Sequence, residues 1–239
     1  MVVRAAVSGV TGLQNEPTAW VIQNSLRFRG SQVLKFTPGT GASTRTKGTI
    51  SFWIKTGAII NNTPAFFYAG DTSIYQSFEG IAAFGQWRFY ALETGVNDKF
   101  SSSTLLPYHR DHSSWYHVVA AYDTTQIPSN RADQAQVYVN GRRQEGPAVA
   151  NTAGGDTAYF NNVLHYIGGN AFADPDTNTN YCLAEIHAVQ GQVLSPSDFG
   201  FTDPQTGAWR PKKYTGSYGT NGYYLDFSDP PDRDWETCP

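Results

Sequence analysis

The stretch SSWYHVVAAYD at residues 113–123, followed by QVYVNGRRQE at 136–145, decides the fold class of this chain. Residues 115–123 are largely apolar on both faces of an expected strand, as in the middle of a β-sandwich. Residues 135–139 form the next expected strand, and Asn140-Gly141 after it favours a tight type I′ turn. The two stretches therefore predict a buried strand followed by an antiparallel hairpin.

Alternation of apolar and polar residues predicts further strands on both sides of this stretch. In residues 49–55, Ile50, Phe52 and Ile54 share one face of a strand, while Trp53 lies on the other. No window shows a convincing helical stripe. Other expected strands are 25–29, 33–37, 65–69, 86–92, 164–168, 181–189 and 223–227. So many strands without βαβ alternation predict an all-β fold, a two-sheet antiparallel jelly-roll sandwich.

Composition narrows the classes of partner. The chain has 239 residues, 14% of them aromatic and only 15% charged, with a net charge of −3. No basic stripe is present, so we expect no nucleic-acid partner. No apolar run is long enough to cross a bilayer, so we expect no membrane insertion. The first residues lack the apolar core of a secretory signal, which favours synthesis and folding in a cytoplasm.

The chain divides at about residue 200. Residues 1–200 are expected to form the sandwich, with a core at 20–200, and the only helix signal, 195–199, ends it. There Ser195 suits a helix cap and is followed by a proline at the first helical position. Residues 201–239 are richer in Pro, Gly and Asp. They are expected to form a short wrap-around extension packed on the sandwich, with one strand near 223–227.

Four segments in a fixed order carry a family resemblance. They are GTISFWIKTG (48–57), the two stretches quoted first, LHYIGG (164–169) and CLAEIHAVQGQVLSPSDFG (182–200). Together they resemble the laminin-G-like domains of the concanavalin A-like lectin/glucanase superfamily, which implies a concanavalin A-like sandwich over residues 20–200. Residues 195–227 resemble a subgroup of these domains found in structural proteins of bacteriophages and prophages.

The resemblance implies a function. We expect a bacteriophage virion protein, made in the host cytoplasm, that binds host-surface glycan as a module of a tail fibre or other exposed virion structure. One alternative is a capsid or tail decoration protein that binds mainly other virion proteins. A second alternative is a bacterial surface lectin. Weak single sites gain avidity from several copies, so we also expect a homo-oligomer.

The superfamily contains glycosidases, but the sequence predicts no catalytic residue. Related glucanases carry Glu-x-Asp on one strand, and none of the six glutamates here is followed two residues later by Asp. The cluster His109-Arg110-Asp111-His112, with His117 nearby, resembles a metal or acid/base group. We favour a polar loop entering a strand, with His117 as a packing residue.

One loop carries the predicted ligand contacts. Asp174, Asp176, Asn178 and Asn180 are the expected carbohydrate-binding residues, and the first three are also candidate calcium ligands. Oxygen side chains at alternate positions suit Ca²⁺, although Thr179 stands where a calcium loop needs glycine. An Asx-rich turn that satisfies its own backbone is the alternative, and it stays open.

Two further sets of residues allow more than one interpretation. Cys182 and Cys238, the only cysteines, are expected to be unpaired thiols, with a disulfide as the alternative. Exposed aromatic rings can stack on sugars, but aromatics on alternating strands are more often core residues, and we favour the core for this set. Its members are Trp87, Tyr90, Tyr159 and Phe160.

Overall fold

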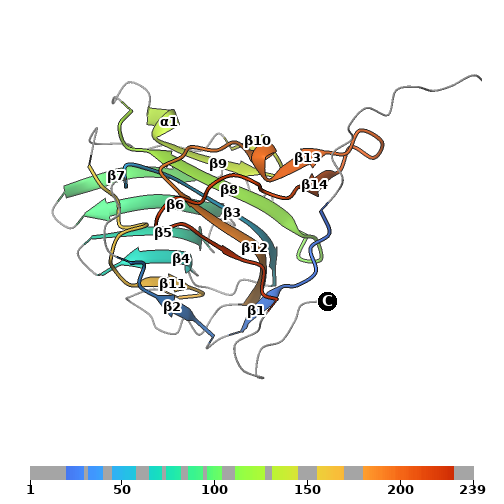
Figure 1. Ribbon diagram of the computed structural model, residues 1–239, viewed down its shortest axis with the longest axis horizontal. Coiled ribbons are helices and arrows are strands. Elements are labelled where there is room, and N and C mark those ends of the chain that lie inside the picture. Colours follow the sequence, from blue (N-terminus) through green and yellow to red (C-terminus); the bar gives the residue numbers. More distant parts are fainter. Residues whose placement is uncertain are drawn as a thin grey trace, which may run out of the picture.

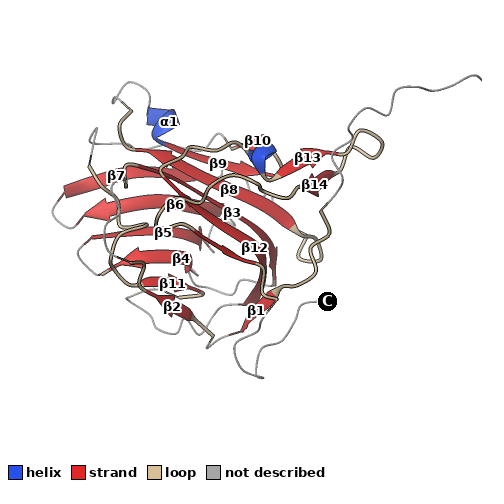
Figure 2. Ribbon diagram, viewed as in Figure 1, coloured by secondary structure: helices blue, strands red, loops and turns tan. Residues whose placement is uncertain are grey.

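The computed structural model describes residues 20–29, 32–39, 45–57, 65–71, 74–81, 86–93, 96–103, 111–126, 131–144, 155–169 and 180–228. The strands in these ranges form two large antiparallel sheets, packed as layers (Figures 1 and 2). The first sheet has the order β1 (Leu26–Arg29), β12 (Asn180–Gln190), β3 (Lys47–Thr56), β8 (Tyr116–Asp123), β9 (Ala135–Val139) and β10 (Arg142–Arg143). The second has the order β2 (Leu34–Phe36), β11 (His165–Ile167), β4 (Ala65–Gly70), β5 (Ile74–Ile81), β6 (Gln86–Glu93) and β7 (Val96–Ser103).

The remaining elements are short. Strands β13 (Gly200–Thr202) and β14 (Trp209–Pro211) form a small sheet of their own, and β15 (Tyr223–Leu225) pairs with β12. Within the described ranges the only helical segments are α1 (Arg131–Gln134) and one 3₁₀ turn, η3 (Pro196–Asp198). The predicted fold class, an all-β two-sheet antiparallel sandwich, is confirmed. The region expected to add a strand near 223–227 contains β15.

The core lies between the inner faces of the two sheets. Ile50, Phe52 and Ile54 alternate along β3 and are fully buried, as the sequence pattern predicts. The Phe52 ring lies 4.7 Å from that of Phe67 on β4, so the two sheets meet through aromatic contacts. Burial of such large apolar side chains is the main driving force for this packing.

The hairpin turn between β9 and β10 has the predicted type I′ geometry. Asn140 and Gly141 have φ values of 48° and 77°, both in the left-handed region that this turn requires. The Asn140 side-chain oxygen also accepts a hydrogen bond of 2.8 Å from the backbone N–H of His117. A side chain at Gly141 would meet the ring of Trp209 at 2.4 Å, so glycine is needed here for space as well as for φ.

Residues 193–222, which we call the cover segment, run back across the outer face of the first sheet (Figure 1). Phe199, Tyr214 and Tyr218 pack there against buried side chains of β8 and β12. The segment starts at η3, where the Asp198 carboxylate accepts hydrogen bonds of 2.9 Å from both the backbone N–H and the hydroxyl of Ser195. The helix signal of the sequence therefore marks the start of a third layer.

The edge of β12 is shared by two short strands. β1 pairs with residues 180–183 of β12, and β15 pairs with residues 186–188. Between them the register of β12 against β3 shifts from Ala184 to His187, and Glu185 has a φ of 48°. A positive φ at a non-glycine residue is uncommon and is a feature of bulges. This bulge places the Glu185 side chain at the junction of β1 and β15.

Candidate functional site

Most of the predicted ligand loop lies outside the described residues, including Asp174, Asp176 and Asn178. Asn180 is described as the first residue of β12. Its side-chain oxygen lies 3.5 Å from Nη2 of Arg27, and its backbone oxygen accepts a hydrogen bond of 2.7 Å from Gly57. Asn180 therefore anchors the start of a strand next to a cavity of about 190 Å³, which basic side chains including His112 also line.

The aromatic residues considered as sugar platforms are core residues. Trp87, Tyr90, Tyr159 and Phe160 have exposed fractions of 0%, 7%, 2% and 1%. The favoured interpretation of these four residues is confirmed, and none can stack on a ligand from solvent.

The histidine cluster is not brought together as one site in the described residues. His117 is buried on the outer face of β8, whereas His112 is exposed in the preceding turn. His109 and Arg110 lie outside the described residues. The interpretation of His117 as a packing residue is confirmed.

The expectation of unpaired thiols is wrong for Cys182, which is disulfide-bonded. The other cysteine of the chain, Cys238, lies outside the described residues. Cys182 lies on the outer face of β12, next to the edge that β1 covers. Sequence spacing alone could not reveal this, because the pairing of cysteines depends on their distance in the fold.

A pocket of about 420 Å³ opens on the outer face of the first sheet, at the end that the cover segment leaves open. We call it the tryptophan pocket. One wall is residues 20–25, which we call the arm, and the opposite wall is the end of β14. Trp53 and Ala184, neighbours across β3 and β12, lie at its base. The lining residues are Trp20, Val21, Ile22, Gln23, Asn24, Ser25, Trp53, Trp115, Ala184, Arg210 and Pro211.

The base of the pocket rests on a stack of aromatic rings. The ring of Trp53 lies 5.1 Å from that of His117, which in turn lies 5.9 Å from the ring of Trp209. Trp209 Nε1 donates to His117 Nδ1 at 2.9 Å, so His117 Nε2 carries the proton and donates to the Ser51 hydroxyl at 2.8 Å. Burial lowers the pKa of His117 to about 3, which keeps the ring neutral. The base is therefore uncharged and is held by hydrogen bonds to His117 on both ring nitrogens.

The arm is fixed at Trp20. Its backbone N–H donates to the carbonyl oxygen of Pro211 at 3.1 Å, and its indole Nε1 donates to the Glu185 carboxylate at 3.2 Å. The same carboxylate oxygen accepts a hydrogen bond of 2.8 Å from the Tyr224 hydroxyl. Burial raises the pKa of Glu185, and the two hydrogen bonds oppose that rise. The bulge in β12 thus supplies the anchor for one wall of the pocket.

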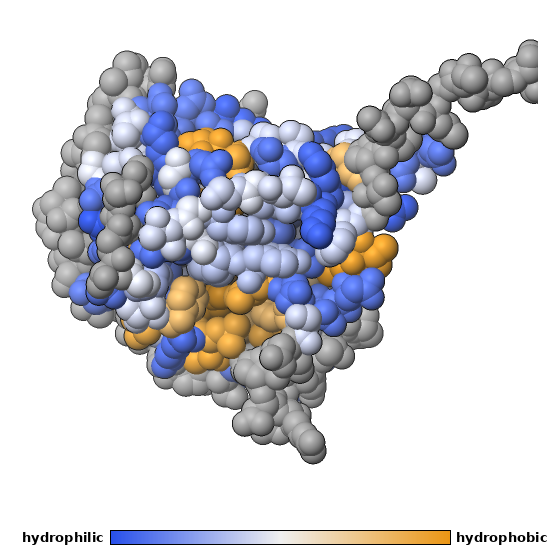
Figure 3. Space-filling view, viewed as in Figure 1, coloured by the Kyte–Doolittle hydropathy of each residue, from blue (hydrophilic) through white to orange (hydrophobic). Residues whose placement is uncertain are grey.

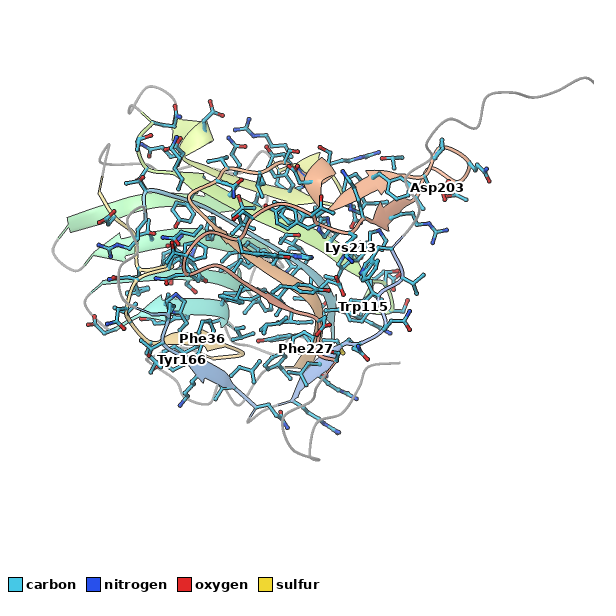
Figure 4. All side chains as sticks on the ribbon, in the orientation of Figure 1. Phe36, Trp115, Tyr166, Asp203, Lys213 and Phe227 are labelled. Atoms are coloured by element: carbon cyan, nitrogen blue, oxygen red, sulfur yellow. The ribbon has the colours of Figure 1, made fainter. Side chains whose placement is uncertain are left out.

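Cations lie at the rim of the pocket. Arg210 lines it from β14, and its Nε lies 3.4 Å from the Asp203 carboxylate. The Lys213 ammonium lies 5.0 Å from the centre of the Trp20 ring, within the range of a cation–π contact. Figure 4 shows Trp115, Lys213 and Asp203 at the same end of the ribbon. Aromatic surface, side-chain amides and a guanidinium in one concave site suit a polar ligand that has apolar ring faces.

The described ranges contain no group of three or more His, Cys, Asp or Glu side chains able to hold a metal ion. No helix among them is long and apolar enough to cross a membrane.

Comparison with known proteins identifies the family. The sequence model described as the concanavalin A-like lectin/glucanases superfamily, Laminin G 3, matches residues 28–198. The chain belongs to this family. Its fold is therefore a carbohydrate-binding fold of the lectin/glucanase type, as the sequence resemblance implies. Among curated protein sequences, none matches the chain at a significant level.

Solved structures of other proteins share the fold at low sequence identity. Domain 4 of AbnA, a GH43 extracellular arabinanase from Geobacillus stearothermophilus in complex with arabinotriose, has a TM-score of 0.50 and 17% identity, covering 72% of each chain. The binding domain of botulinum neurotoxin serotype D has a TM-score of 0.53 and 12% identity, covering 77% of this chain and 44% of that one. Mouse laminin α1 domains LG4-5 have a TM-score of 0.48 and 16% identity, covering 91% and 52%. The first two likenesses show the fold alone.

Sequence reasoning missed the tryptophan pocket because its lining comes from distant parts of the chain. Trp20, Trp53, Trp115 and Arg210 converge only after the cover segment folds back over the first sheet. One signal was present, since Trp53 lies on the face of β3 opposite to Ile50, Phe52 and Ile54. A tryptophan on that face implies a second apolar layer or a ligand site there, and the structure places the cover segment and the tryptophan pocket beside it.

Proposed function

We propose that this chain is a glycan-binding module without enzymatic activity, and that it works in an exposed part of a bacteriophage virion. The observation that carries the glycan-binding proposal is the tryptophan pocket. Its lining combines three tryptophans with Gln23, Asn24 and Arg210. Indole rings pack on the apolar faces of sugar rings, and amides and guanidinium groups bond their hydroxyls.

The family supports this use of the pocket. The family is described by its lectins and glucanases, and the AbnA domain with the same fold was solved with arabinotriose. A fold hosts several functions, so the assignment here rests on the pocket and not on the neighbours.

The absence of catalysis is part of the proposal. Glycoside hydrolysis needs two carboxyl groups flanking the bond. No Asp or Glu is among the described residues that line the pocket. The nearby Glu185 already accepts hydrogen bonds from Trp20 and Tyr224 behind the pocket wall. We expect no hydrolysis of bound oligosaccharides.

The virion assignment rests on the resemblance of residues 195–227 to phage structural proteins. We expect the chain to be found in purified particles, as a homo-oligomer exposed on a tail fibre or another surface structure. Its absence from particles would refute this part of the proposal and would leave glycan binding to be judged alone.

A second candidate function, binding to other virion proteins, is favoured by an apolar seam. The side chains of the seam close the gap between the edge strands β2 and β15 and are only partly buried. Figure 3 shows apolar side chains gathered in the lower middle of the view, where Figure 4 labels Phe36 and Phe227. The seam consists of Leu34, Phe36, Val163, Tyr223, Leu225 and Phe227.

A glycan array tests the proposed function. We expect the chain to bind a subset of bacterial surface oligosaccharides, and Trp115→Ala to weaken that binding about tenfold or more. Trp115 is half-buried beside the pocket, so its loss should leave the fold intact. Leu164→Ala, at an exposed residue before β11, is the control and should bind normally. Binding that survives Trp115→Ala unchanged would place the site elsewhere.

A further inference from the structure

We infer that the tryptophan pocket selects acidic saccharides, in which a carboxylate on the sugar ring pairs with Arg210. This inference rests on the proposed function and names the class of ligand. Arg210 is the only ionisable residue among the described residues that line the pocket. The chain as a whole is acidic, with a net charge of −3, whereas the charge in the described lining of this pocket is positive.

The guanidinium of Arg210 is held in place by an acidic neighbour, Asp203. Asp203 contacts it at Nε from the turn between β13 and β14. Backbone N–H groups of Gln205 and Thr206 hold the Asp203 carboxylate at 2.9 and 3.1 Å, and they are the main cause of its lowered pKa. A guanidinium has five N–H donors, and a carboxylate accepts two of them in parallel. Asp203 thus orients the group from its Nε side.

A second cation lies at the arm, the wall opposite Arg210, and adds to the positive field. The Lys213 ammonium lies over the Trp20 ring at 5.0 Å from its centre. Glu185, the acidic group that anchors Trp20, is buried and already accepts two hydrogen bonds. Burial raises its pKa, and the two hydrogen bonds oppose that rise. A neutral sugar uses the aromatic and amide groups of the pocket but leaves this field unused.

A uronic acid matches this arrangement. Its carboxylate projects from the edge of the sugar ring, so the ring can lie against indole while the carboxylate reaches a cation at the rim. Hydrogen bonds to charged groups contribute more than neutral ones. The pocket therefore distinguishes a uronic acid from the matching neutral hexose mainly through Arg210.

The test uses paired ligands. Oligogalacturonate, oligoguluronate and oligoglucuronate are each compared with their carboxyl-reduced counterparts, in chelator so that bridging calcium plays no part. We expect the chain to bind at least one acidic oligosaccharide about tenfold more tightly than its reduced partner. Arg210→Gln should remove that preference and leave binding of the reduced oligosaccharide within about twofold. Arg142→Gln, an equal change of charge at an exposed residue of β10, should keep the preference.

The outcomes separate the two proposals. Equal binding of acidic and reduced oligosaccharides that is sensitive to Trp115→Ala would overturn the acidic preference and keep the glycan site. A preference that survives Arg210→Gln would overturn the assignment to Arg210. If neither the acidic nor the reduced ligands bind, and the glycan array is also blank, the proposed function fails and the acidic preference with it. Weaker binding of the acidic ligand at high salt, without change for the reduced one, would support the ion pair.

Discussion

The two ends of the first sheet's outer face are built by the same strands but meet different partners. At one end, Val119 and Val189 are buried beneath the aromatic side chains of the cover segment. At the other end, Trp53 lies at the base of an open pocket. The sheet presents apolar side chains at both ends. The path of the cover segment therefore decides which end becomes core and which end can bind a ligand.

Lowering the pH should produce the largest loss of stability, because it acts on buried histidines. Burial lowers the pKa of His117 to about 3, and those of His165 and His187 to about 4. In the unfolded chain histidine titrates near 6.5, so the unfolded state takes up protons first as the pH falls. Stability is present above about pH 6.5 and is lost between there and pH 4, at about 1.4 kcal/mol per pH unit for each histidine.

Urea unfolding at pH 7, 6 and 5 measures this loss. His187→Gln should reduce the slope by about one third, because one of these three histidines, all buried, no longer takes up a proton. Glu185 acts in the opposite direction, since its raised pKa gives stability that is lost as the pH rises. A free energy of unfolding that stays constant from pH 7 to pH 5 would contradict the prediction.

Removing the ring of Trp209, which joins the two ends of the outer face, should have the next largest effect on stability. Trp209 stacks on His117, donates a hydrogen bond to it, and fills the space above Gly141 and Gly200. We expect Trp209→Ala to lower the free energy of unfolding by about 3 kcal/mol, because it creates a cavity and leaves His117 Nδ1 without its donor.

Trp115, at the open end of the outer face, serves as the comparison for Trp209. Trp115→Ala should cost about 1 kcal/mol or less, since the residue lies beside the pocket and is only half-buried. Trp209→Phe keeps most of the packing and should give an intermediate value. Equal losses for Trp209→Ala and Trp115→Ala, measured in urea, would mean that the two ends do not differ in packing.

The sandwich was predictable from sequence because its signals are local. Alternation in residues 49–55 and the Asn-Gly turn each depend on neighbours in the chain, and both match the structure. β5 and β7 were not predicted. Residues 96–103, which form β7, are mostly polar, and pairing with β6 makes them a strand despite that composition.

The pocket was not predictable because it depends on long-range contacts. Trp20 reaches its place through hydrogen bonds to Pro211 and Glu185, which are far away in sequence. The bulge at Glu185 also has no local signal, since glutamate rarely adopts a positive φ. It forms where β1 ends and β15 begins, and that junction exists only once the C-terminal part of the chain has returned to β12.

Removing the charge of Glu185, which anchors the arm, should change the free energy of unfolding by a smaller amount and in the opposite direction. Glu185→Gln keeps an oxygen that can accept from Trp20 and Tyr224 but removes a buried charge. We expect the free energy of unfolding to rise by an amount on the order of 1 kcal/mol at pH 8. At pH 4 the gain should vanish, because the raised pKa leaves the native carboxyl protonated there. A loss of stability at pH 8 would show that the carboxylate's charge is needed to hold the arm.

The smallest effect on glycan binding is expected from the predicted calcium loop. Asp174→Ala/Asp176→Ala, with and without chelator, should leave binding in the tryptophan pocket within about twofold of the native value. The described residues that line the pocket come from the arm, the first sheet and β14, with Trp115 just before β8. If Asp174, Asp176 and Asn178 do bind calcium, the ion should raise the Tm of the native chain and not that of the double variant. A glycan interaction abolished by both chelator and the double substitution, but indifferent to Trp115→Ala, would move the site from the pocket to the loop. The two variants together thus decide between the open end of the first sheet and the loop that precedes β12.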